Sequence, residues 1–261
     1  METLIQMILP AAVLPAILSL LALWLNQQKA IAPWIIALIW LPSCVWLVGM
    51  PALIPEEASH WLVPLVIFSV LIAVLLKSQV KQQVLLQIIL LLLILVAVVW
   101  PVLSYQFSWM LVAELLAVIL AASALYLLSA TNQKALPALT MMISSGGMGL
   151  VVALGGSLLI GQLAGALASV LFAFVLFELV SRLNKSAVTV IELVPVMQLY
   201  FVILVIARVF AEIEMVPSLM LLLAPLASVV INKRYAFVAS ALCIGIAVLW
   251  LLMTTDSSGY Y

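Results

Sequence analysis

The sequence is poor in charge and in residues that hold metals. Charged residues make up 7% of the 261 residues, with nine acidic and nine basic side chains. The single histidine, His60, excludes a haem held by two histidines, and no Cys/His cluster is present for zinc or iron–sulfur. The only aspartate, Asp256, excludes a metal site built from aspartates. We therefore expect no metal, no cofactor and no enzymatic activity, and the zero net charge argues against a nucleic-acid partner.

Apolar sequence, in contrast, is abundant. Hydrophobic residues make up 69% of the chain, and its mean hydropathy is +1.44. A soluble domain is about half apolar and about a quarter charged. Because a soluble core could not hide this much apolar surface, the lipid bilayer is the expected solvent. We expect an all-α, polytopic integral membrane protein.

About ten stretches approach the roughly 20 apolar residues that a helix needs to cross a bilayer. They are continuously apolar rather than alternating, so a lipid-facing β-barrel is not expected. The ninth is the least regular because it contains Pro217 and Pro225. The expected helices, arranged in five hairpins, are Leu4–Leu25, Ile31–Met50, Trp61–Leu76, Val84–Leu103, Trp109–Leu128, Leu136–Leu154, Leu158–Val180, Ala187–Phe210, Met215–Ile231 and Tyr235–Met253.

The connections after every odd-numbered helix are polar, and together they hold eight of the nine basic residues. Basic residues mark the cytoplasmic loops of membrane proteins. Both termini are therefore predicted to lie outside a bacterial-type inner (plasma) membrane. We expect one transmembrane domain over residues 1–261, with a short polar external tail at 254–261.

An odd number of helices in each half makes residues 1–131 and 132–261 run in opposite senses. This is the topological condition for the inverted repeats of many secondary transporters. The two halves show no convincing sequence match, so the prediction concerns their orientation alone.

Three polar residues are predicted in the outer half of the bundle. Glu114 and Gln162 lie about one and a half turns inside the outer ends of their helices, and Arg208 lies just inside another outer end. An ionisable group within a bilayer is costly, so these residues are candidates for a substrate or ion pathway. We expect them to form one polar cluster. The alternative is that Arg208 pairs with Glu212 one turn on, with Glu114 separately protonated.

A second group of pathway candidates lies near the inner face. Glu178 and Arg182 are four residues apart, the spacing of an intrahelical ion pair. Glu192 precedes Pro195, which removes a backbone donor and is expected to act as a hinge. A carboxylate beside a broken helix is typical of transporter ion sites. The alternative is a plain kinked helix in which Glu192 pairs with Arg182 or Lys185.

Small residues recur at every fourth position on both sides of a Gly155-Gly156-Ser157 turn. Residues four apart share one helix face, and a face of small residues lets two helices approach closely in lipid. We therefore expect close antiparallel packing of the sixth and seventh helices. The expected packing residues are Ser145, Gly149, Gly161, Gly165 and Ser169.

The fifth helix contains Glu114-Leu115-Leu116, and the sixth helix and its turn contain Ser144-Ser145-Gly146-Gly147 and Gly156-Ser157-Leu158. These stretches faintly resemble the proton-antiporter-like membrane subunits of respiratory complex I and of multisubunit sodium/proton antiporters. Those subunits have a glutamate in the fifth helix, where this chain has Glu114, and an external amino terminus, so the resemblance implies both features here. The intramembrane lysines of those subunits have no counterpart here and the chain has too few helices, so it is not assigned to that family.

These patterns favour a small-solute or ion transporter with intramembrane carboxylates. The alternative is a non-transporting membrane subunit, or an assembly partner, of a larger membrane complex. The scarcity of polar groups that could hold a hydrophilic substrate favours this alternative. A central polar cavity would support transport, and a solid bundle would support the subunit. The expected partners are the lipid bilayer and other membrane subunits or further copies of the chain.

Overall fold

The computed structural model describes residues 9–25, 34–50, 55, 57–76, 79–131, 137–182, 193–231 and 233–257. Every regular element in these residues is a helix. The two short non-α elements are η1 (Leu9–Val13) and η2 (Ala58–Trp61). The α-helices are α2 (Leu14–Leu25), α3 (Trp34–Val48), α4 (Leu62–Leu75), α5 (Val80–Tyr105), α6 (Trp109–Thr131), α7 (Pro137–Leu154), α8 (Leu158–Arg182), α9 (Val194–Phe210), α10 (Met215–Leu223), α11 (Ala227–Val230) and α12 (Lys233–Ser257).

Within the described residues these helices follow the expected stretches, apart from small shifts at several ends and three larger differences. α5 begins at Val80 rather than at Val84, because the lysine and glutamines between them are good helix formers. The expectation of one continuous ninth helix is wrong, since α10 ends at Leu223 and α11 begins only at Ala227. α12 continues through Thr254, whose hydroxyl lies 3.1 Å from the carbonyl oxygen of Trp250, so the polar stretch 254–261 begins as helix.

Five helical stretches in the described part of the chain are long and apolar enough to cross a membrane. Shorter apolar helices lie within η1–α2, α3, α7 and α9. The ten-span count, the hairpin topology and the sidedness of the termini stay predictions. The five long stretches are Ala58–Leu75, Val80–Tyr105, Trp109–Leu128, Leu158–Leu176 and Tyr235–Thr254.

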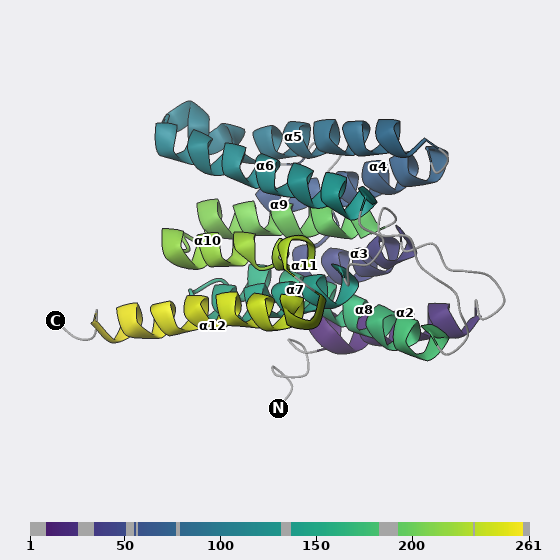
Figure 1. Cartoon of the computed structure of the whole chain (residues 1–261). Coiled ribbons are helices and arrows are strands. Elements are labelled where there is room, and N and C mark those ends of the chain that lie inside the picture. Colours follow the sequence, from purple (N-terminus) through teal and green to yellow (C-terminus); the bar gives the residue numbers. More distant parts are fainter. Residues whose placement is uncertain are drawn as a thin grey trace.

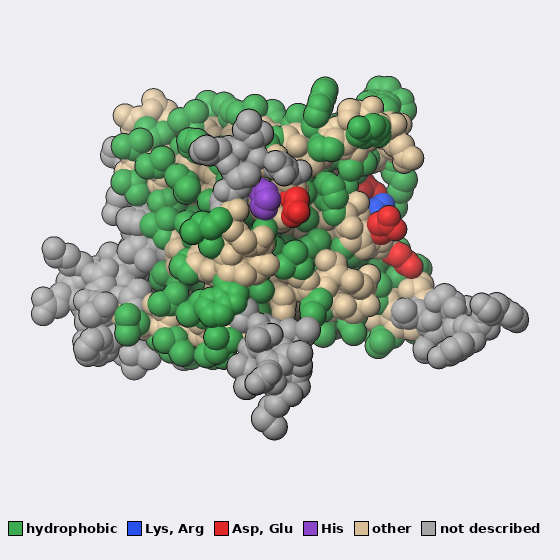
Figure 2. Space-filling view, turned by 180° about the vertical axis from the view of Figure 1, so that it is seen from behind, with side chains coloured by type: hydrophobic (Ala, Val, Ile, Leu, Met, Phe, Trp, Pro, Cys, Tyr) green, Lys and Arg blue, Asp and Glu red, His purple; other side chains and the backbone are tan. Residues whose placement is uncertain are grey.

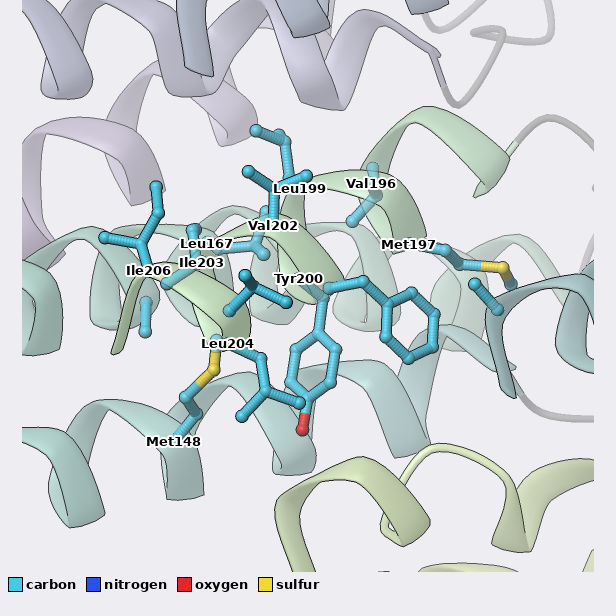
Figure 3. Packing of buried hydrophobic residues seen from close by; sticks show 14 of the residues in the cluster. Met148, Leu167, Val196, Met197, Leu199, Tyr200, Val202, Ile203, Leu204 and Ile206 are labelled. Carbon is cyan, nitrogen blue, oxygen red and sulfur yellow. The ribbon is translucent and has the colours of Figure 1, made fainter. Parts of the chain in front are cut away.

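The helices lie largely side by side, with α9 in the interior (Figure 1). α9 contacts α3, α4, α5, α6, α7, α8 and α10. Every residue from Val194 to Ala207 is buried, and Figure 3 shows side chains leaving this helix on several sides. A helix that is apolar all round is the kind that a larger bundle encloses. α9 therefore forms the centre of the bundle, and its two ends position the polar groups described below.

α7 and α8 make the closest helix pair. Gly156 takes φ +108°, and the Ser157 amide donates to the Val152 carbonyl oxygen at 3.1 Å, a glycine cap that ends α7. A Cβ atom on Gly161 would lie 2.8 Å from the Gly149 carbonyl oxygen. Only glycine permits this approach, so the two backbones touch where the sequence places its small residues.

The other expected packing residues are divided between two faces. Ser145 on α7 is fully buried. The open side of Gly165 faces the carbonyl oxygen of Ala11 in η1, and the Ser169 hydroxyl lies 3.4 Å from the same oxygen. The α8 stripe therefore serves α7 through Gly161 and also serves η1 through Ser169.

The break between α10 and α11 has a definite chemical cause. Pro225 has no N–H to donate to the Leu221 carbonyl one turn earlier. The Tyr200 hydroxyl of α9 donates to that carbonyl oxygen instead, at 2.6 Å. The Ser240 hydroxyl of α12 donates to the Ala224 carbonyl oxygen, at 2.5 Å. Neighbouring helices thus satisfy the backbone groups at the break, as a lipid environment requires.

Candidate functional site

A two-pronged ion pair joins α6 to the C-terminal end of α9. Arg208 Nη2 donates to Glu114 Oε1 at 2.9 Å, and Arg208 Nε donates to Glu114 Oε2 at 3.0 Å. The two side chains are only 25% and 19% exposed. Such paired contacts fix both the distance and the orientation of the two groups. The alternative pairing of Arg208 with Glu212 is therefore wrong.

The chain after α9 supplies Arg208 with a third acceptor. Arg208 Nη1 donates to the Ile213 carbonyl oxygen at 2.7 Å. The turn that places this carbonyl passes through Glu212, which takes φ 52°. A positive φ is strained for a side chain other than glycine. The guanidinium group is thus held on two sides, by a carboxylate from α6 and by a backbone oxygen.

A narrow crevice borders this ion pair. It is lined by side chains of α6, α9 and α10, including Leu115, Leu204 and Leu222. The volume open to a water molecule is about 30 Å³, room for about one or two waters. Its walls are apolar apart from the ion pair and Ser218. The crevice therefore offers few partners to a hydrophilic solute.

The predicted cluster is assembled only in part. The structure brings Glu114 and Arg208 together, whereas Gln162 lies on α8, which does not line the crevice. Acidic side chains and a basic one gather at the right-hand edge of Figure 2, on a surface that is otherwise mostly hydrophobic. A role of Glu114, Gln162 and Arg208 in a substrate or ion pathway stays a prediction.

The inner candidates fall mostly outside the described residues. This holds for Glu192 and for the side chains of Glu178 and Arg182. Pro195 is described, and it stands in the first turn of α9, which begins at Val194. A proline in the first turn removes no intrahelical hydrogen bond. The expected hinge at Pro195 within a longer helix is therefore not seen in the described part of the chain.

The sequence interpretation missed a buried amide network at the N-terminal end of α9. Gln87 Nε2 donates to the Ser69 carbonyl oxygen, and the Ser69 hydroxyl donates to Gln87 Oε1, both at 2.8 Å. Gln198 Nε2 donates to the Gln87 carbonyl oxygen at 2.6 Å. All three residues are fully buried. The network joins α4, α5 and α9 without any charge.

A signal for this network was present in the sequence. Gln83 and Gln87 are four residues apart and share one face of α5, and Gln79, the residue before the helix, continues the same spacing. Gln79 is exposed, whereas Gln83 and Gln87 are buried. In the sequence, Gln79 and Gln83 belong to a polar stretch between two apolar runs. That stretch is therefore predicted to be a connection, although Gln83 and Gln87 are buried in the bundle.

The described residues define an all-helical chain with five helices that could cross a membrane. Within those residues no group of three or more histidine, cysteine or acidic side chains is placed to hold a metal. No protein-family model, curated protein or solved structure matches the chain. Its function is therefore inferred from its own residues.

Proposed function

We propose that this chain is a non-transporting subunit of a larger membrane complex. The observation that carries the proposal is the solid centre of the bundle. α9 is buried from Val194 to Ala207 and is enclosed by seven other helices. A carrier of hydrophilic solutes needs a polar site near the bilayer midplane, whereas the buried side chains of the enclosed helix α9 are apolar apart from Gln198 and Tyr200.

The ion pair supports the same function. Glu114 has both oxygens engaged by Arg208, and the Ile213 carbonyl oxygen takes a further N–H of the same guanidinium group. A pair held this firmly has little capacity left for a passing ion. Its role in the proposal is to tie α6 to α9 and to the start of α10.

A large apolar surface remains uncovered on α5, α6 and α12. Leu93 of α5, Leu120 of α6 and Leu242 of α12 are all more than 60% exposed. Lipid covers such a surface in any membrane protein, and a subunit uses part of it to bind its neighbours. The proposed partner is another membrane protein with an apolar, helix-packing surface.

A transporter remains the second candidate function, favoured by one observation. The ion pair borders the crevice between α6, α9 and α10. Intramembrane ionisable groups beside a cavity are typical of ion and proton pathways. Because the crevice has room for about one or two waters, this second function is restricted to protons or small cations.

The assembly state of the chain in its own membrane tests the proposal. The chain, tagged and expressed at its natural level, is extracted in mild detergent and separated by native electrophoresis. We expect it in a species well above the 28.2 kDa of one chain, with a second membrane protein at a fixed ratio. Residue-specific crosslinks from α5, α6 or α12 to that protein are part of the expected result.

Two substitutions at matched exposure locate the binding face. Leu242→Trp changes α12 and Leu93→Trp changes α5, and each side chain is about equally exposed, at 62% and 61%. We expect one of them to release the partner while the other leaves the complex intact. A chain that migrates only with copies of itself, with both variants unchanged, would contradict the proposal.

A further inference from the structure

The crevice beside the Glu114–Arg208 ion pair is a groove in the side of the bundle. α6 and α10 form its walls, and both pack on α9, which forms its floor. Met215 and Leu219 on the α10 wall are exposed, so the groove opens at the surface that lipid covers. With the open part included, its volume is about 450 Å³. A ligand can therefore enter it sideways from the bilayer.

The groove is polar at one end and apolar further in. Glu114 lies in the second turn of α6 and Arg208 lies in the last turn of α9, so the ion pair stands close to the ends of these helices. Deeper in the bundle the lining continues for about one turn along α6 and α9. The deepest lining residues, Val118, Leu204 and Leu222, are all apolar. A lipid has the same division into a polar head and an apolar tail.

The width of the groove selects a thin occupant. A helix with its side chains is about 10–12 Å across, far wider than a groove with room for about one or two waters in its closed part. A single acyl chain is thin enough to lie along it. Because lipid tails are as apolar as leucine, the chain gains little by leaving the bilayer for the groove. Any selectivity must therefore come from the headgroup.

The charges at the polar end determine which headgroup fits. Arg208 has five N–H donors, and three of them bind Glu114 and the Ile213 carbonyl oxygen, which leaves two. Glu212 and Glu214 stand on either side of Ile213. Both are exposed, and neither pairs with a basic side chain in the described part of the chain. Figure 2 shows acidic side chains around a basic one at this edge. The polar end thus carries spare N–H donors and two unmatched negative charges.

A headgroup with both a phosphate and a primary ammonium matches these two features. The phosphate accepts hydrogen bonds from a guanidinium group, and the ammonium donates up to three hydrogen bonds to carboxylates. An anionic glycerol headgroup brings no cation to the two carboxylates. A choline headgroup brings a cation that has no N–H to donate.

We propose that this groove binds a phospholipid with an ethanolamine headgroup. The phosphate lies at Arg208, the ammonium lies at Glu212 and Glu214, and one acyl chain follows the apolar lining of α6, α9 and α10. The site belongs to a single chain and does not depend on the subunit function, since lipid binding and assembly with a partner are measured separately.

Native mass spectrometry of the full-length protein tests the site. The protein is freed of its own lipid in detergent and titrated with phosphatidylethanolamine, phosphatidylcholine and phosphatidylglycerol that carry identical acyl chains. We expect the first phosphatidylethanolamine to bind several-fold more tightly than either of the other lipids. An affinity that does not exceed both of the others would overturn the proposal, and this comparison needs no variant to fold.

The headgroup contacts are tested by removing charge. The double variant with Glu212→Gln and Glu214→Gln should lower the phosphatidylethanolamine affinity several-fold, to that of phosphatidylcholine. Glu57→Gln is the matched control, because Glu57 is also exposed but does not line the groove, and it should leave the affinity unchanged. An ethanolamine preference that survives in the double variant, or that is lost equally in Glu57→Gln, would contradict the assigned contacts.

The place of the acyl chain is tested by filling the groove. Ala117→Trp fills it from the α6 wall, whereas Ala113→Trp adds the same side chain at an exposed residue of α6 outside the lining. We expect Ala117→Trp to lower the phosphatidylethanolamine affinity several-fold and Ala113→Trp to leave it unchanged. Equal affinities of the two variants would place the lipid outside the groove and refute the site.

Discussion

The two ends of α9 solve the same problem by different chemistry. At the C-terminal end Arg208 carries a charge, is a quarter exposed and is matched by the carboxylate of Glu114. At the N-terminal end Gln198 is neutral and fully buried, and it bonds to the Gln87 backbone. Charge is placed where the chain leaves the bundle, and amides are used where it is enclosed. The difference follows from the cost of a charge, which grows steeply with its distance from water.

Of the substitutions at the two ends of α9, removal of Arg208 should lower the free energy of unfolding most. Arg208→Leu leaves the Glu114 carboxylate half-buried without its partner. We expect the free energy of unfolding to fall by about 3 kcal/mol, the lower end of the range for a broken buried ion pair, because both groups are partly exposed. Unfolding in mixed micelles measures the change.

Lys81→Leu is the matched control, because Lys81 is exposed on α5. That variant should stay within about 0.5 kcal/mol of the unmodified protein. Equal effects of the two substitutions would show that the Arg208–Glu114 contact contributes nothing specific.

Substitutions in the amide network should lower the free energy of unfolding less than Arg208→Leu, and Gln87 and Gln198 should differ in their effects. Gln87→Leu removes both hydrogen bonds to Ser69 and leaves its buried hydroxyl and carbonyl groups with fewer partners, at an expected cost of about 2 kcal/mol. Gln198→Leu removes one hydrogen bond together with an unpaired oxygen, and should cost less than about 1 kcal/mol. The same unfolding assay compares them, and the reverse order would refute the network as drawn.

Two tyrosines that are both fully buried sharpen the comparison further. Tyr200→Phe leaves the Leu221 carbonyl, freed by Pro225, without a donor, and should cost about 1–2 kcal/mol. Tyr126→Phe removes a hydroxyl that bonds to no described protein group, so we expect a smaller loss. Thermal unfolding of the two variants in the same detergent ranks them. A larger loss for Tyr126→Phe than for Tyr200→Phe would contradict the assigned role of the Tyr200 hydroxyl, because the hydroxyl that matters more for stability would then lie on α6.

The smallest expected effect is a gain. Glu212 holds φ 52° in the turn that delivers the Ile213 carbonyl oxygen to Arg208. Glu212→Gly relieves that strain but loosens the unfolded chain, so the net stabilisation should be about 0.5 kcal/mol. Glu214→Gly, at a residue without a positive φ, should not stabilise. Calorimetric melting temperatures of the pair decide the point.

The charged end of α9 could be anticipated from the sequence because charge is rare in this chain. Glu114 and Arg208 lie within apolar runs. Because an unpaired charge is costly there, the two residues are predicted to form an ion pair. The close approach at Gly149 and Gly161 could be anticipated in the same way, from small residues at helical spacing.

The amide end could not be found as easily. Glutamine is common in connections, and the face shared by Gln83 and Gln87 begins in a polar stretch. Whether Gln198 meets that face depends on which helices are neighbours, which no spacing within one helix reveals. The contact of Tyr200 with the α10–α11 break could not be predicted for the same reason. Pro225 predicts that a carbonyl loses its helical hydrogen bond, but not which residue donates to that carbonyl instead.

The most direct test of the central claim is ion flux through the purified protein in liposomes. If the bundle is a solid subunit with a structural ion pair, proton and sodium flux should equal that of protein-free liposomes, and Glu114→Gln should change nothing. Flux well above that background, lost in Glu114→Gln but kept in Lys81→Gln, would contradict the account and establish Glu114 as part of an ion pathway.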